Sequence, residues 1–347
     1  FRKQIQPNIC VLENVTFEPG ELKAYMDYIG QDLFTMQLQN TLHQFEEADN
    51  FGSLIRPDLT DVEPMLQFIN AKGAGSDLFL NKTHQKVLQV LAQAEYLRPK
   101  YHVVVANPPY MGSGNMNGRL SSWIKDNYPD YKSDLFSAFI VRNTELAVPR
   151  GQLGFMSPYV WMFISSHEKL RQYLIKQKTI TSLIQLEYSG FDGATVPICT
   201  FTLQNSYEPG FKGGYIKLSD FRGSERQGPK TLEAIRNPDC GWFYRASASN
   251  FEKIPGSPIA YWVSGRLLNS FEQPQLDTWA PVKQGLATAD NNRFLRIWAE
   301  VSITKIGFNY RSIHQTNDAS HRWFPYNKGG SFRKWHGNKE FLVLWEN

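Results

Sequence analysis

Hydrophobic residues follow a helical period in the first hundred positions of the chain. Between residues 81 and 97, apolar side chains such as Val87, Leu88 and Leu91 fall at the spacing of one helix face, which predicts a helix there. A longer helical segment is expected over residues 21–46, and it ends near a turn at residues 49–52.

Short apolar runs replace the helical period from residue 101 onward. They are rich in β-branched residues, which predicts strands, and they cover residues 101–106, 152–156, 180–186 and 198–203. A helix is expected between the first two runs, with Ser133 as its N-terminal cap. This alternation predicts an α/β fold with a mostly parallel, doubly wound sheet. The first run, Tyr-His-Val-Val-Val-Ala, is typical of a buried parallel strand.

The composition and periodicity of the sequence change again near residue 206, where we place a domain boundary. Beyond it, glycine, proline and aromatic residues become dense and no long helical period survives. Residues 206–347 hold 19 Lys and Arg against 13 Asp and Glu, whereas the chain as a whole has a formal net charge of +4. The basic C-terminal part therefore suits a polyanionic partner.

Composition narrows the class of protein. Apolar residues make up 41% of the 347 residues, enough to bury a sizeable core, and no apolar run is long enough to cross a membrane. The N-terminus lacks the apolar segment of a signal peptide. Three widely spaced cysteines form neither a metal-ligand pattern nor a disulfide framework, so we expect a reduced, cytoplasmic protein without a metal site.

The sharpest chemical signal follows the first predicted strand, at Asn107, Pro108, Pro109 and Tyr110. In an open α/β sheet, ligands bind at the carboxyl ends of the strands. The proline nitrogens carry no hydrogen, so this stretch offers carbonyl acceptors with few competing donors. Such acceptors can hold the hydrogens of a nucleobase amino group, whose lone pair is delocalised into the ring, and a tyrosine can stack on the base. The tetrapeptide therefore predicts methyl transfer to an exocyclic amino group.

Several segments together resemble the gamma class of amino-methyltransferases that act on adenine. The Asn-Pro-Pro-Tyr motif is the hallmark of that chemistry, and residues 134–136, 154–156 and 191–196 follow in the order of that class. Residues 285–294 are similar to the entry into its target recognition domain, although the family usually has Gly where Ala289 stands. Residues 323–330 resemble a stretch inside that domain. The combination resembles the PglX methyltransferases of BREX phage-exclusion systems and their relatives among fused restriction-modification enzymes.

The resemblance implies a fold, a cofactor and partners. We expect a partial Rossmann-like methyltransferase sheet in residues 1–205, a connecting or inserted region in residues 206–280, and the start of a mixed α+β target recognition domain in residues 281–347. The methyl donor is expected to be S-adenosylmethionine, and the substrate double-stranded DNA with a flipped adenine. Phe191 matches the aromatic residue that stacks on the base opposite Tyr110. Other phage-defence subunits are further expected partners.

The cofactor-binding elements of the family are expected upstream of the Asn-Pro-Pro-Tyr motif. The glycine-rich residues 72–76 follow helical sequence rather than a strand, so they do not match the family's cofactor loop. The chain does not begin with Met, and the resemblance implies that these elements precede Phe1. We therefore expect the isolated chain to be inactive and to bind S-adenosylmethionine weakly or not at all, which a calorimetric titration can test.

Residues 320–339, here called the basic aromatic segment, combine five Lys or Arg residues with five aromatic ones and contain no acid. Cations neutralise phosphates while aromatic rings stack on bases, so the segment is a candidate DNA contact. A small aromatic core with a solvated basic rim is the alternative. The candidate DNA-binding residues of the C-terminal part are Arg293, Lys328, Arg333 and Lys334.

Three functions remain open on sequence grounds. The first is adenine methylation in DNA, and the second keeps the chemistry but uses RNA adenine or a protein glutamine as substrate. In the third, the chain is a non-catalytic DNA-specificity module, although the intact Asn107 and Tyr110 argue against a degenerate site.

Overall fold

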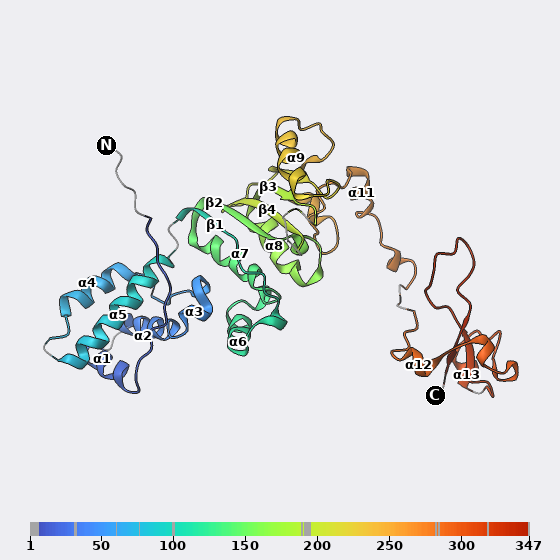
Figure 1. Ribbon diagram of the computed structural model, residues 1–347, viewed down its shortest axis with the longest axis horizontal. Coiled ribbons are helices and arrows are strands. Elements are labelled where there is room, and N and C mark those ends of the chain that lie inside the picture. Colours follow the sequence, from blue (N-terminus) through green and yellow to red (C-terminus); the bar gives the residue numbers. More distant parts are fainter. Residues whose placement is uncertain are drawn as a thin grey trace. The chain divides into compact units, whose positions relative to one another are not determined.

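The computed structural model describes residues 7–30, 33–59, 61–75, 77–98, 101–188, 190, 196–281, 283, 285–317 and 319–345. It forms two compact units, Phe1–Gln273 and Pro274–Asn347, which Figure 1 shows in blue to yellow and in orange to red. Within the described residues, no helix is both long and apolar enough to cross a membrane.

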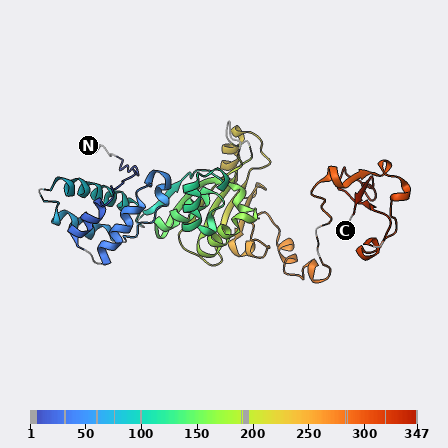
Figure 2. The same ribbon diagram turned by 90° about the horizontal axis from the view of Figure 1, so that it is seen from below.

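The first unit begins with a helical bundle (Figure 1; Figure 2). The long helix α5 contacts α1, α2 and α4, and their apolar faces form one buried core. The helices of the bundle are α1 (Glu21–Ile29), α2 (Leu33–Gln44), α3 (Ala48–Phe51), α4 (Val62–Lys72) and α5 (Leu78–Tyr96). The helical segment expected over residues 21–46 forms two helices instead of one, because α1 ends at Ile29 and its C-cap, Gly30, has a φ of 105° that does not continue a helix.

A six-stranded sheet follows the bundle. Its strands are β1 (Tyr101–Ala106), β2 (Ala147–Pro158), β3 (Thr179–Gln185), β4 (Ile198–Gln204), β5 (Lys212–Lys217) and β6 (Phe243–Ser247). Their order is β1-β2-β4-β3-β5-β6, and the helices between and after them are α6 (Gly118–Asn127), α7 (Leu135–Leu146), α8 (Glu168–Gln177), α9 (Ser224–Arg236), α10 (Ala248–Glu252) and α11 (Gly265–Ser270). The predicted α/β class is confirmed.

The expectation of a mostly parallel sheet is wrong. Only the pairs β1–β2 and β3–β5 run parallel, whereas β2–β4, β3–β4 and β5–β6 run antiparallel. Strand β4 follows β3 in the sequence and lies directly beside it, so the chain returns antiparallel and enters the sheet between β2 and β3. Apolar runs alone do not reveal strand direction.

The two faces of the sheet are covered unequally. One face buries residues such as Leu153, Phe155 and Phe201 against α7 and α8. On the other face, α9 covers the end around β5, but β1 lies at the edge of the sheet with Val103 62% and Val105 77% exposed. The first strand is therefore parallel to its neighbour as expected, but it is not buried.

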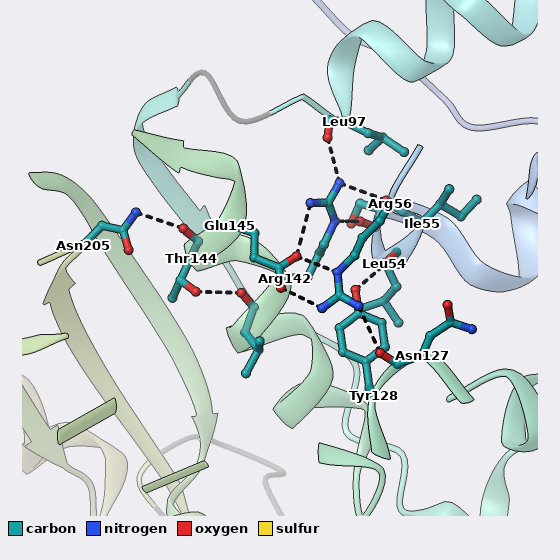
Figure 3. A network of polar contacts seen from close by, with 12 residues as sticks. Leu54, Ile55, Arg56, Leu97, Asn127, Tyr128, Arg142, Thr144, Glu145 and Asn205 are labelled. Atoms are coloured by element: carbon teal, nitrogen blue, oxygen red, sulfur yellow. Dashed lines mark hydrogen bonds and ion pairs between the residues drawn. The ribbon is translucent and has the colours of Figure 1, made fainter. Parts of the chain in front are cut away.

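A buried arginine joins the bundle to α7 (Figure 3). Arg142 is only 3% exposed, and its guanidinium donates to the backbone carbonyls of Ser53 at 3.0 Å, Ile55 at 2.9 Å and Leu97 at 2.7 Å. A buried guanidinium is tolerated where its N–H groups find acceptors. These hydrogen bonds fix residues 53–55 and the end of α5 against α7.

A second arginine, Arg56, also connects the bundle to α7. Arg56 makes a bidentate ion pair with Glu145, with N–O distances of 2.7 and 2.6 Å, and its Cζ lies 4.0 Å from the ring centroid of Tyr128. The Tyr128 hydroxyl donates to the carbonyl of Leu54 at 2.7 Å. Bidentate arginine–carboxylate pairs add geometric specificity to their energy, so this cluster sets the angle between the bundle and α7.

The second unit is built on a small antiparallel sheet of order β7-β9-β8. Its strands are β7 (Leu295–Ile297), β8 (Trp323–Tyr326) and β9 (Phe341–Leu344), and its helices are α12 (Asn291–Phe294) and α13 (Ile313–Asn317). It therefore mixes helices and strands, as expected. In the first unit, β5 and β6 lie beyond residue 205 and extend the same sheet. The functional roles assigned to the three residue ranges remain predictions.

Candidate active site

The Asn-Pro-Pro-Tyr motif lies immediately beyond the end of β1. Asn107 and Pro109 are exposed, Pro108 is buried and Tyr110 is partly buried. Asn107 lines a cavity of about 430 Å³ on the face of the sheet that α9 covers only in part, together with residues of β2 such as Gly154 and Met156. The side chain that carries the predicted chemistry is therefore open to a ligand.

Tyr110 makes a direct contact with Asn107. Its hydroxyl donates a hydrogen bond to Asn107 Oδ1 at 3.0 Å. Burial raises the pKa of the Tyr110 hydroxyl, and nearby Cys199 raises it further, so the hydroxyl stays protonated and remains a donor at neutral pH. A carbonyl oxygen has two lone pairs, and Asn107 Oδ1 thus keeps one for a second donor.

The ends of β2 and β3 bring further polar side chains to the same edge of the sheet. Tyr159 follows β2, and its backbone N–H donates to the carbonyl of Pro197 at 3.0 Å. Gln185 ends β3 and is buried; its Oε1 accepts from the Tyr261 hydroxyl at 2.8 Å. The raised pKa of Tyr159 comes mainly from burial, while a hydrogen bond with Gln185 works against it. Sequence reasoning missed Tyr159 and Gln185, although the predicted strand ends were the signal that could have found them.

The loop after Tyr110 is tied to the start of α7. Asp134 Oδ1 accepts from the backbone N–H of Met111 at 3.0 Å and from that of Phe136 at 3.3 Å. Asp134 is therefore the N-terminal cap of α7, and the expectation of a Ser133 cap is wrong. The hydroxyl of Ser133 instead donates to the carbonyl of Ser166 at 3.1 Å. An aspartate side chain reaches the first-turn amides from its cap position as readily as a serine does.

Phe191, the predicted second stacking residue, lies outside the described residues. Its role remains a prediction.

The candidate DNA-binding residues all belong to the second unit. Arg293 is exposed on α12, with its Cζ 5.0 Å from the ring centroid of Phe294. Lys328 is partly buried, with its Nζ 4.7 Å from the ring centroid of Phe341, and lines a cavity of about 290 Å³ with Asn292. Lys328 therefore lies beside α12, the helix that carries Arg293, although Arg293 itself does not line this cavity.

Arg333 and Lys334 lie in the connection between β8 and β9, and both are exposed. The neighbouring Phe332 and Trp335 are 87% and 89% exposed, whereas Trp323 belongs to β8. The basic aromatic segment thus divides into a strand within the small sheet and an exposed loop. The loop displays cations and rings together, as the DNA-contact prediction requires.

Comparison with known proteins gives the site a context. Residues 29–191 match the Eco57I restriction-modification methylase family. The adenine-specific methyltransferase PglX of Lacticaseibacillus casei (strain Zhang) is 33% identical over 358 residues, covering 100% of this chain and 29% of the relative. The chain is homologous to adenine-specific methyltransferases.

A second such relative is the adenine-specific methyltransferase BrxX of Escherichia coli O9:H4 (strain HS), 33% identical over 318 residues. That match covers 89% of this chain and 25% of the relative, so the chain spans less than a third of either methyltransferase. Among solved structures, a nuclease-deletion mutant of the Type ISP restriction-modification enzyme LlaGI in complex with a DNA substrate mimic gives a TM-score of 0.39 at 15% identity, covering 56% of this chain and 18% of that one.

The cavity beside Asn107 does not match the needs of S-adenosylmethionine. Such a cofactor presents ribose hydroxyls and an ammonium group, for which a carboxylate is the natural partner. The residues that line the cavity are all uncharged. Within the described part of the chain, the glycine-rich residues 73–75 follow α4 rather than a strand. The described residues that line this cavity therefore offer no carboxylate to the ribose or the ammonium group of S-adenosylmethionine.

Proposed function

We propose that the chain carries the methyl-acceptor site of an adenine-specific DNA methyltransferase that acts in the cytoplasm, in phage defence or restriction-modification. The observation that carries the proposal is the exposed Asn107 side chain at the end of β1, followed by two prolines that have no N–H. Homology to adenine-specific methyltransferases supports the choice of adenine.

The residues of the motif act on the amino nitrogen through their oxygens. The free lone pair of Asn107 Oδ1 accepts one amino hydrogen, and the carbonyl of Pro108 accepts the other. With both hydrogens held, the nitrogen pyramidalises and its lone pair becomes available for attack. S-adenosylmethionine, if bound, would supply the methyl group and leave as S-adenosylhomocysteine, and the methylated nitrogen would release its extra proton to water. No strong general base is needed, because orientation of the two reactants provides much of the rate.

Adenine in a duplex must leave the base stack before its amino group can reach Asn107. Tyr110 is proposed to stack on the extruded ring, and its position directly after the acceptor residues and its partial exposure support this role. Base–aromatic stacking contributes about 1–3 kcal/mol. Phe191 is proposed as the opposing ring.

The second unit is proposed to bind the DNA backbone. Arg293, Lys328, Arg333 and Lys334 supply positive charge, and the exposed Phe332 and Trp335 supply rings. Contacts with phosphates fix a protein's register on the duplex, while contacts with base edges select the sequence. Further phage-defence subunits are proposed partners.

Product analysis tests the proposal directly. The full-length protein is incubated with duplex DNA and S-adenosylmethionine labelled in the methyl group, and the DNA is digested to nucleosides. We expect label in N6-methyladenine for the wild type and its loss in Asn107→Ala. Parallel reactions offer RNA and a glutamine-containing peptide as acceptors. Labelling of either acceptor in place of DNA, or the absence of methylated adenine, would contradict the proposal.

A further inference from the structure

The backbone that follows Tyr110 is held by one carboxylate. Met111 donates its N–H to Asp134 Oδ1 at 3.0 Å and accepts at its carbonyl from the N–H of Leu135 at 3.0 Å. One residue beyond, Gly112 and Asp134 form an antiparallel bridge, and Ser113 N–H donates to the carbonyl of Ser133 at 3.1 Å. Both polar groups of the Met111 backbone are therefore fixed by residues 134 and 135.

The same carboxylate oxygen also caps the N-terminus of α7. It accepts from the N–H of Phe136 at 3.3 Å, and α7 is anchored in the core through residues such as Leu135 and Phe136. The helix cannot shift without disturbing that core, because interiors are close-packed. Asp134 therefore transmits the rigidity of α7 to the residue next to Tyr110.

We propose that Asp134 is a positioning residue that holds Pro109 and Tyr110 in the geometry needed for methyl transfer. The proposal rests on the proposed function of Asn107–Tyr110. Asp134 acts through the Met111 backbone and is not proposed to contact the base. The role requires an acceptor oxygen and a short side chain, and it does not require a negative charge.

Burial raises the pKa of the Asp134 carboxyl, although the backbone hydrogen bonds oppose that shift. The site therefore tolerates the loss of charge. Asparagine is as good a helix cap as aspartate, and its Oδ1 can accept from the same two N–H groups. Asp134→Asn consequently keeps the anchor, whereas Asp134→Ala removes it.

A second helix in the chain provides a matched control. Asp77 caps α5, and its Oδ1 accepts from the N–H groups of Phe79 at 2.8 Å and Leu80 at 3.1 Å. Asp77→Ala therefore removes a comparable cap that has no link to Tyr110. Any effect that is common to both alanine variants reflects the loss of a helix cap, and any effect confined to Asp134→Ala reflects the position of the loop.

Hydrogen exchange and kinetics test the proposal separately. In the 347-residue chain, the Met111 amide should exchange slowly in the wild type, in Asp134→Asn and in Asp77→Ala, and markedly faster in Asp134→Ala. In the full-length protein, Asp134→Ala should lower kcat on the order of 100-fold, as a misplacement of about 1 Å can, with KM for DNA unchanged. Asp134→Asn should restore kcat.

Unchanged Met111 exchange or unchanged kcat in Asp134→Ala would overturn the proposal. So would an Asp134→Asn variant that is as slow as Asp134→Ala while its Met111 amide stays protected, because charge and not anchoring would then matter. If the wild type methylates no adenine, the proposed function fails, but Met111 exchange still decides whether Asp134 anchors the loop.

Discussion

Two arginines of the first unit and three cations of the second unit lie in opposite environments. In the first unit, Arg142 and Arg171 are buried, and their guanidinium groups donate to backbone carbonyls at distances of 2.6 to 3.0 Å. In the second unit, Arg293, Arg333 and Lys334 are exposed. A buried charge must satisfy its donors within the protein, whereas an exposed one is free to meet a phosphate. The position of a cation, more than the net charge, therefore separates a structural role from a binding role.

Replacement of a buried arginine gives the largest effect expected from this comparison. Arg142→Met leaves the carbonyls of Ser53, Ile55 and Leu97 without their donor, and we expect the free energy of unfolding to fall by about 3–5 kcal/mol. Chemical denaturation measures the change. Arg333→Met, at an exposed position, should stay within about 0.5 kcal/mol of the wild type. Equal losses in the two variants would remove the contrast between the units.

Substitutions of Tyr110 test the proposed active site of the first unit. Tyr110→Ala removes the proposed stack on the base and should slow single-turnover methylation by the equivalent of about 1–3 kcal/mol. Tyr110→Phe keeps the ring and loses only the hydrogen bond to Asn107, so it should retain most of the rate. A phenylalanine variant as slow as the alanine variant would show that the hydroxyl, and not the ring, is essential.

The exposed cations of the second unit should govern DNA binding without affecting stability. The double variant Arg333→Ala/Lys334→Ala should weaken binding to all DNA sequences alike. A plot of the logarithm of the binding constant against the logarithm of the salt concentration has a negative slope. Each lost phosphate contact should reduce the magnitude of this slope by about 1. Fluorescence anisotropy over a range of salt concentrations measures both quantities. An unchanged salt slope would exclude these residues as phosphate contacts.

A smaller effect is expected at Ala289, where φ is 55°. Left-handed backbone costs an L-residue about 1–2 kcal/mol, and glycine adopts it freely. Ala289→Gly should therefore raise the free energy of unfolding of the second unit by up to about 1 kcal/mol, as measured by thermal denaturation. Ala299→Gly, at a residue without positive φ, should be neutral or destabilising. A loss of stability in Ala289→Gly would contradict this explanation.

Local features of the site could be predicted from the sequence. The end of β1 and the acceptor character of Asn107–Tyr110 follow from β-branched residues and from the chemistry of proline, which act within a few residues. The order of the sheet and the exposure of Val105 depend on which strands pair at long range. The hydrogen bond between Tyr110 and Asn107 depends on side-chain conformation, so no sequence pattern indicates it.

The basic aromatic segment shows a second limit of sequence reasoning. Its spacing of rings and cations indicated a DNA contact, with a small aromatic core as the alternative. In the structure, Trp323 belongs to β8, whereas Phe332 and Trp335 are exposed in the following loop, and the DNA contact remains a prediction. Composition cannot separate these residues, because only strand pairing between β8 and β9 determines which rings are covered.

The most direct test of the central claim replaces the acceptor oxygen at residue 107. Single-turnover methylation of duplex DNA by the full-length protein is compared for the wild type, Asn107→Asp and the nearly isosteric Asn107→Leu. DNA binding is measured in parallel. We expect the aspartate variant, which keeps an acceptor oxygen, to retain measurable methylation, and the leucine variant to lose about 100-fold or more in rate with unchanged DNA affinity. A leucine variant that methylates adenine as fast as the wild type would contradict the role assigned to Asn107.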